Sequence, residues 1–161
     1  MERPKVFKSI SSFFRKKAEM QRAVAILKTG MVYLQGYSKT DHGLWIGYGR
    51  VICVKAYDFD ALSTAVRKVI KASSQHAPHP SNWSIVQQPM LDATGAKNWK
   101  NLSRGAIAVG ISSEAEILRF TPSKNYEADG GTDLPEKIIH AGVEEMNLGE
   151  ILMKAFELCE P

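Results

Sequence analysis

The sequence has little cysteine and no long apolar run, and each absence excludes a class of protein. Its 161 residues include two cysteines, Cys53 and Cys159, which are too few for a disulfide framework. No stretch reaches the ~18 apolar residues of a membrane-spanning helix. The basic N-terminus also lacks the apolar stretch of a signal peptide. We therefore expect a reduced, cytoplasmic protein that makes no membrane contact.

Motifs that would support catalysis or hold a cofactor are also missing. The sequence has no Gly-x-Ser-x-Gly elbow and no Cys-x-x-Cys pair. His76 and His79 have a spacing that can chelate a metal on a helix, but Pro78 and Pro80 forbid that helix. The glycines of residues 43–49 lead into a strand, whereas a phosphate-binding loop leads into a helix N-terminus. The sequence thus predicts a protein that is not an enzyme and has no cofactor or metal.

The charge of the chain is divided unequally between its two halves. Residues 1–80 contain 14 Lys and Arg against 5 Asp and Glu, and residues 81–161 contain 7 against 12. The net charge of +4 conceals this division. Such an asymmetry indicates a charged partner or a surface with two poles.

The two halves also resemble each other weakly. A shift of 85 positions sets Ala23–Ile26 on Ala108–Ile111, and a shift of 86 sets Leu62 on Leu148. The same types of element are expected in the same order in both halves. We therefore predict a single domain, residues 1–161, built of two degenerate pseudo-repeats (about 1–76 and 86–161) that a Pro-containing linker joins.

Each pseudo-repeat is expected to contain three strands followed by a helix. Alternating and β-branched residues predict the strands, Asp58 or Asp60 is a candidate cap for the first long helix, and Asn147 with Glu150 resembles a capping box for the last one. Two such units can share an antiparallel sheet with helices packed on one side, which is an α+β fold. The expected elements are a helix at Ser9–Met20, strands at Arg22–Lys28, Met31–Tyr37 and Gly49–Tyr57, a helical turn around Trp99, and strands at Ala106–Ile111, Glu116–Thr121 and Lys137–Val143.

Several short motifs resemble the immunity proteins of bacterial contact-dependent growth inhibition (CDI). They are Gly43-Leu44-Trp45, the helix from Leu62 to Ser73, the linker His79-Pro80-Ser81-Asn82-Trp83, and the helix start Asn147-Leu148-Gly149. This resemblance implies a cytoplasmic protein that binds a cognate toxin domain and blocks its activity. Toxins of this class are often nucleases, frequently acting on tRNA. The resemblance assigns no functional residue.

The acidic half of the chain supplies the candidate contacts with such a toxin. A nuclease binds phosphates in a positive cleft, so an inhibitor can offer carboxylates in their place. Asp41 and Trp45, in the first half, form the next candidate surface. The acidic candidates are Glu127, Asp129, Asp133 and Glu136 around a Gly-Gly loop, with Glu144 and Glu145 expected nearby.

The alternative function is an RNA- or DNA-binding module in the basic N-terminal half. Basic side chains would bind the nucleic acid backbone and aromatic side chains would stack on bases. The acidic second half would repel the same backbone, which disfavours this alternative. The residues concerned are Arg15, Lys16, Lys17, Arg22 and Lys28, with Tyr33, Tyr37, Trp45 and Tyr48.

Overall fold

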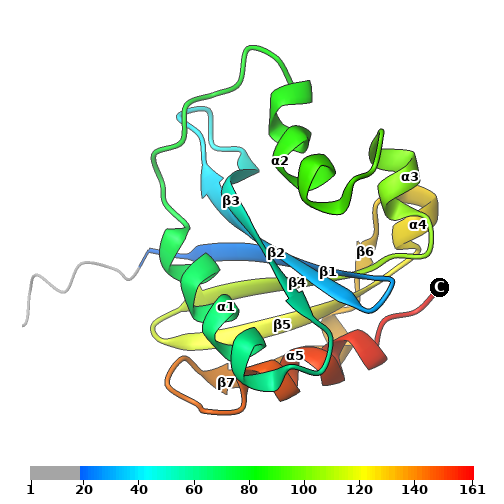
Figure 1. Ribbon diagram of the computed structural model, residues 1–161. Coiled ribbons are helices and arrows are strands. Elements are labelled where there is room, and N and C mark those ends of the chain that lie inside the picture. The colour runs from blue at the N-terminus through cyan, green and yellow to red at the C-terminus, as the bar shows by residue number, and fades with distance from the viewer. Residues whose placement is uncertain (1–18) are drawn as a thin grey trace, which may run out of the picture.

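Seven strands lie side by side in the computed structural model, which describes residues 19–161, and every neighbouring pair is antiparallel (Figure 1). Their order is β3-β2-β1-β4-β5-β6, and β7 also pairs with β5. The strands are β1 (Gln21–Lys28), β2 (Met31–Lys39), β3 (Trp45–Lys55), β4 (Ile107–Glu114), β5 (Ile117–Lys124), β6 (Thr132–Asp133) and β7 (Ile139–Gly142). The helices are α1 (Phe59–Ala72), α2 (Ser84–Thr94), α3 (Trp99–Ser103), α4 (Tyr126–Asp129) and α5 (Leu148–Glu157), with a 3-10 turn at Pro135–Lys137.

Two hairpins of the same kind form the centre of the sheet. Thr29 and Gly30 join β1 to β2, and Ala115 and Glu116 join β4 to β5. All four residues have positive φ angles, as both central residues of a type I′ turn require. β1 then pairs with β4, so the two hairpins meet at the middle of the sheet. Each half of the chain contributes its strands and one long helix in the same order, and a common origin by duplication stays a prediction.

The long helices α1 and α5 cover one face of the sheet, here called the α1/α5 face (Figure 1). Alternate residues of the central strands point to this face, as the period-2 pattern predicted. The α+β antiparallel fold is therefore confirmed. Fully buried side chains in this core include Val32, Leu34, Leu62, Val66, Phe120, Leu148 and Leu152.

The opposite face, here called the α2/α3 face, carries a second and smaller core (Figure 1). Met90 and Leu91 of α2 and Leu102 of α3 pack there against Ile26 and Tyr33 of the sheet. The sequence predicted helices on one side of the sheet, where α1 and α5 lie, and did not predict α2, which has 11 residues against the 10 of α5. Two features of the sequence explain why this helix was not predicted. Pro89 lies within it, and proline is unusual in helix interiors. The apolar residues of α2 also do not recur clearly at helical spacing.

Helices α1 and α5 cross in close contact at Ser63 and Gly149. The Ser63 Oγ accepts a hydrogen bond from the Gly149 backbone N–H at 2.8 Å and donates one to the Met146 carbonyl at 3.3 Å. A Cβ atom on Gly149 would lie 2.2 Å from the Phe59 carbonyl oxygen. The predicted capping box is wrong, because the side chain of Asn147 makes no capping hydrogen bond and Ser63 bonds the free N–H of the helix instead.

The remaining expectations differ from the structure mainly at element ends. Asp58 is the cap of α1, and its Oδ1 accepts from the Ala61 N–H at 3.3 Å. The third strand begins at Trp45 rather than near Gly49, and the last begins at Ile139 because the 3-10 turn precedes it. The helix expected at Ser9–Met20 lies outside the described residues except for its last two positions, which are neither helix nor strand. No helix in the described part of the chain has the length and apolar character needed to cross a membrane.

Candidate partner-binding site

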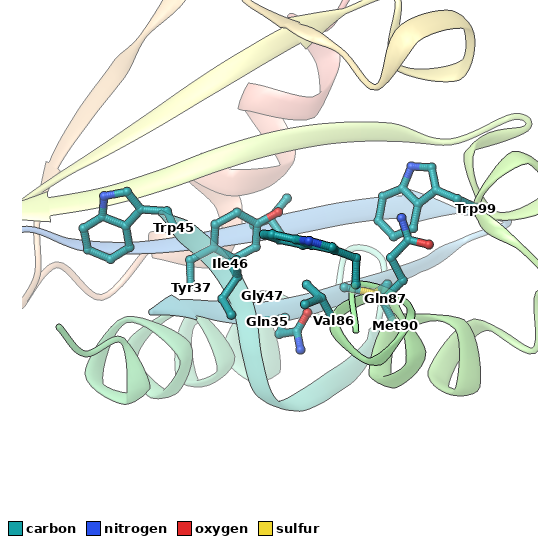
Figure 2. Close-up of a pocket in the computed structure, with 11 residues that line it drawn as sticks. Gln35, Tyr37, Trp45, Ile46, Gly47, Val86, Gln87, Met90 and Trp99 are labelled. Carbon is teal, nitrogen blue, oxygen red and sulfur yellow. The ribbon is translucent and has the colours of Figure 1, made fainter. Parts of the chain in front are cut away.

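A groove on the α2/α3 face brings together all three tryptophans of the chain. It has a volume of about 240 Å³ and lies between α2 and strands β1 to β3. Figure 2 shows Trp45 at one end of the groove and Trp99 at the other, with Tyr37, Gln35 and Met90 between them. The complete lining is Val24, Gln35, Tyr37, Trp45, Ile46, Gly47, Trp83, Val86, Gln87, Met90 and Trp99.

The floor of the groove is held in place by polar contacts within the sheet. Gln35 is 3% exposed, and its Nε2 donates to the Gly49 carbonyl at 2.9 Å. This bond holds residues 48–50, where the β2–β3 register shifts and β3 bulges. The neighbouring Tyr37 hydroxyl is protonated at neutral pH, as an ordinary tyrosine is, and burial raises its pKa further.

The Pro-containing linker reaches the groove at Trp83, which ends a row of three aromatic rings. The ring of His79 stacks on that of His42 with centroids 3.9 Å apart, and its other neighbour is Trp83 at 5.7 Å. The Ala77 N–H donates to the Lys39 carbonyl at 3.0 Å, which ties the linker to the end of β2. These contacts position Trp83 at the groove although it is 51% exposed.

Trp45 lies at the mouth of the groove and Asp41 lies in the exposed loop before it. The Arg22 guanidinium carbon is 5.0 Å from the centre of the Trp45 ring, a cation–π contact. The sequence predicted these two residues as a candidate surface. Trp45, the first residue of β3, lines the groove, and Asp41 lies in the loop four residues before it. The sequence gives no reason to group Trp83 or Trp99 with Trp45, because they lie 38 and 54 residues after it along the chain.

Four of the predicted acidic residues lie on the segments that follow β5 and return alongside its last residues, here called the acidic corner. Glu127 and Asp129 lie on α4, Asp133 on β6 and Glu136 on the 3-10 turn, and all four are exposed. Two of them have structural contacts as well. Glu127 Oε2 accepts from the Gly105 N–H at 3.0 Å, and Asp129 Oδ1 accepts from the Gly131 N–H at 3.1 Å.

Glu144 and Glu145 do not lie near the acidic corner. They follow β7, whose Gly142 pairs with Ile117 at the start of β5, whereas α4 follows the end of that strand. Ile117 and Ser123, the partner of Asp133, are six residues apart on β5, a distance of about 20 Å. Glu145 Oε1 accepts from the Gly142 N–H at 3.1 Å, and the Arg67 guanidinium donates to the carbonyls of Val143 and Glu145. The expectation that this pair joins the other carboxylates is therefore wrong, because β7 runs back along β5.

The residues of the nucleic-acid alternative are largely used in other ways. The Lys28 ammonium donates to the carbonyls of Asn101, Leu102 and Arg104 at 2.5, 2.8 and 3.0 Å, where it satisfies the last carbonyls of α3. Tyr33 is 8% exposed and belongs to the core. Arg15, Lys16 and Lys17 lie outside the described residues. Of the described residues of this set, Arg22, Tyr37 and Trp45 meet at the tryptophan groove, whereas Lys28 and Tyr33 have structural roles.

Within residues 19–161 the structure also shows no grouping of His, Cys, Asp or Glu side chains that could hold a metal ion. Burial raises the pKa of the Cys159 thiol, and a protonated thiol is a poor nucleophile. Burial likewise raises the pKa of the Tyr126 hydroxyl.

The arrangement of the tryptophan groove fits the insertion of a partner's side chains, since it combines aromatic walls with a few fixed polar groups.

Comparison with known proteins identifies relatives by structure alone. No protein-family model and no curated protein matches the sequence. The fold is similar to that of a protein of unknown function from Neisseria meningitidis, with a TM-score of 0.73 and 13% identity over 89% of this chain and 98% of that one. It is also similar to a chain of the CdiA-CT/CdiI toxin and immunity complex from Yersinia pseudotuberculosis, with a TM-score of 0.69 and 13% identity over 89% of this chain and 99% of that one. The chain therefore has the same fold as a component of a toxin and immunity complex.

Proposed function

We propose that this chain is an immunity protein that binds a cognate CDI toxin domain and neutralises it. The observation that carries the proposal is the fold similarity to a chain of a toxin and immunity complex, which extends over 89% of this chain. The short motifs that resemble CDI immunity proteins were found independently of that similarity. A toxin of this kind acts inside the recipient cell, so the proposed location is the cytoplasm.

The tryptophan groove is the proposed anchor site for the toxin. Binding energy in protein interfaces is concentrated in a few aromatic or Arg side chains at pockets. Trp83 is half exposed and Leu44 and Tyr48, on the neighbouring β2–β3 segment, are 41% and 47% exposed. A toxin segment that covers this region would remove these apolar side chains from water, which contributes roughly 25 cal/mol per Å² of apolar area.

The acidic corner is the proposed site of electrostatic attraction. The toxin is proposed to be a nuclease, with tRNA as the expected substrate, and a nuclease binds phosphates with positive charge. Carboxylates that are exposed and gathered at one corner raise the rate of encounter with such a surface. The inhibitor then acts by occluding the active site or an adjacent exosite.

Co-expression with the toxin tests the function directly. We expect the neighbouring reading frame to encode a large secreted exoprotein, whose C-terminal domain is the toxin to test. We expect the toxin domain alone to stop growth, and the chain to restore growth and to co-purify with the toxin. A chain that neither binds the domain nor restores growth would contradict the proposal.

A variant of the groove tests the anchor site. Trp83→Ala should weaken toxin binding about thirtyfold, as the loss of an aromatic anchor does, and should leave folding intact because the side chain is half exposed. Met146→Ala is the matched control, because Met146 is 90% exposed and precedes α5 on the opposite face. Equal affinities of the two variants, measured by calorimetry, would show that the toxin binds elsewhere.

A further inference from the structure

A second groove, on the α1/α5 face, has no role in the proposed toxin binding. It lies between the edge strand β3 and helix α1 and has a volume of about 380 Å³. Ile52 and Val54 of β3 and Ala61 and Ala65 of α1 line its apolar part. Small side chains on α1 leave room for another helix to approach its backbone closely.

The exposed side chains of α1 beside this groove carry opposite charges at its two ends. Asp60, Thr64 and Lys68 follow one another at intervals of four residues, so they lie on one face of the helix, and all three are exposed. Asp60 and Lys68 are about 12 Å apart along the helix axis. The ion pairs of residues 19–161 involve Glu114 with Arg119 and Lys137 with Glu160. Asp60 and Lys68 therefore have no ion-pair partner in that part of the chain.

The opposite charges at the two ends of this face of α1 make it complementary to a second copy of α1 that runs in the opposite direction. If two α1 helices pack antiparallel with Thr64 opposite Thr64, Asp60 of each copy lies opposite Lys68 of the other. A twofold interface requires this kind of self-complementary surface.

We propose that two copies of this chain associate through the groove between α1 and β3, with their α1 helices antiparallel about a twofold axis at Thr64. A contact centred on one helix is smaller than the ~800 Å² per partner of a stable complex, so the association is concentration-dependent. The tryptophan groove lies on the opposite face of the sheet, and it stays open to the toxin in the dimer.

Measurement of the mass in solution is the first test. Sedimentation of the full chain over a dilution series should show a mass that rises from 17.9 kDa towards twice that value as concentration increases. A mass that stays at 17.9 kDa up to the highest soluble concentration would overturn the proposal. Toxin binding is measured on the same samples, so the two proposals can fail separately.

A charge exchange tests the antiparallel arrangement. Asp60→Lys and Lys68→Asp should each weaken self-association about tenfold, because the symmetric dimer loses two ion pairs and gains two like-charge contacts. The double variant Asp60→Lys/Lys68→Asp restores both pairs across the axis and should regain most of the association. Circular dichroism establishes that each variant is folded. Failure of the double variant to recover, with its fold intact, would exclude this arrangement.

A cross-link locates the axis. Thr64→Cys in a Cys53→Ser background removes the exposed native thiol and places two new thiols opposite each other. Disulfides form between Cα atoms about 4.4–6.8 Å apart, so mild oxidation should link most of the dimer. The control is Ser84→Cys in the same background, an exposed position at the start of α2. Equal cross-linking of both variants, or of neither, would contradict the placement of the axis.

Discussion

At the scale of single residues, the start of α5 depends on a side chain from α1. The Gly149 N–H is buried and is bonded to Ser63 Oγ, so Ser63→Ala leaves it without a partner. We expect a loss of about 1–3 kcal/mol in the free energy of unfolding, measured by urea denaturation. Asn147→Ala is the control, since that side chain makes no capping bond, and should change stability by less than about 0.5 kcal/mol. A larger loss for Asn147→Ala than for Ser63→Ala would instead support the capping box.

Gly149 itself is required by the close approach of the two helices. A Cβ atom at this position would lie 2.2 Å from the Phe59 carbonyl oxygen and 2.9 Å from the Leu62 Cβ, so the helices must separate. Gly149→Ala should therefore lower stability by about 1–3 kcal/mol, as overpacking does.

The control for this substitution is another glycine with free space around it. A Cβ atom on Gly110 would find its nearest neighbours at 3.9 Å, at Thr121, which is ordinary contact. Gly110→Ala should leave the thermal unfolding midpoint almost unchanged. Equal midpoints for the two alanine variants would show that α1 and α5 are not in contact at Gly149.

At the scale of elements, the sequence predicts best where one periodicity decides the structure. Leu62, Val66 and Val69 of α1 recur at helical spacing and are buried as expected, because one apolar face meets one face of the sheet. Helix α2 has two buried residues, Met90 and Leu91, in eleven positions, so its pattern is too weak to detect. Its position depends on long-range packing against β3 and α3, which no local pattern encodes.

The end of helix α3 is bonded to a lysine of β1, in addition to the packing of Leu102 in the smaller core. The Lys28 ammonium donates to three carbonyls at the end of α3, and hydrogen bonds to a charged group contribute roughly 1.5–3 kcal/mol. Lys28→Met keeps the apolar part of the side chain and removes the donor. We expect a loss of about 2 kcal/mol in stability and a red shift of tryptophan emission, because Trp99 begins α3. Lys71→Met, an exposed position on α1, is the control and should change neither quantity.

At the scale of the whole molecule, the candidate site could be predicted only in part. Trp45, predicted with Asp41 as the second candidate surface, lines the groove, and Asp41 lies in the exposed loop before it. The linker brings Trp83 to the groove and α3 brings Trp99 there. Only the tertiary structure places these two side chains in one groove with Trp45. The same limit explains Glu144 and Glu145, since the path of β7 along β5 decides on which side of the molecule they lie.

The division of charge over the molecule predicts how fast the toxin is captured. Asp129, Asp133 and Glu136 share the acidic corner, so reversing all three to lysine replaces attraction of a basic toxin by repulsion. The association rate at low salt should fall about tenfold or more, and its dependence on ionic strength should change sign, whereas dissociation should change little. Stopped-flow fluorescence of the three tryptophans measures both rates.

The matched control for this triple variant uses the carboxylates at the other end of β5. Reversal of Glu144 and Glu145 to lysine changes the net charge by +4, against +6 for the triple variant, and acts about 20 Å along β5 from the level of Asp133. That separation exceeds the Debye length of ~8 Å at physiological ionic strength. The two variants are therefore also compared at that ionic strength, where reversal of Glu144 and Glu145 should slow association much less than its charge alone would give. If both variants slow association in proportion to net charge, attraction comes from the total charge of the chain and the acidic corner has no special place in the encounter.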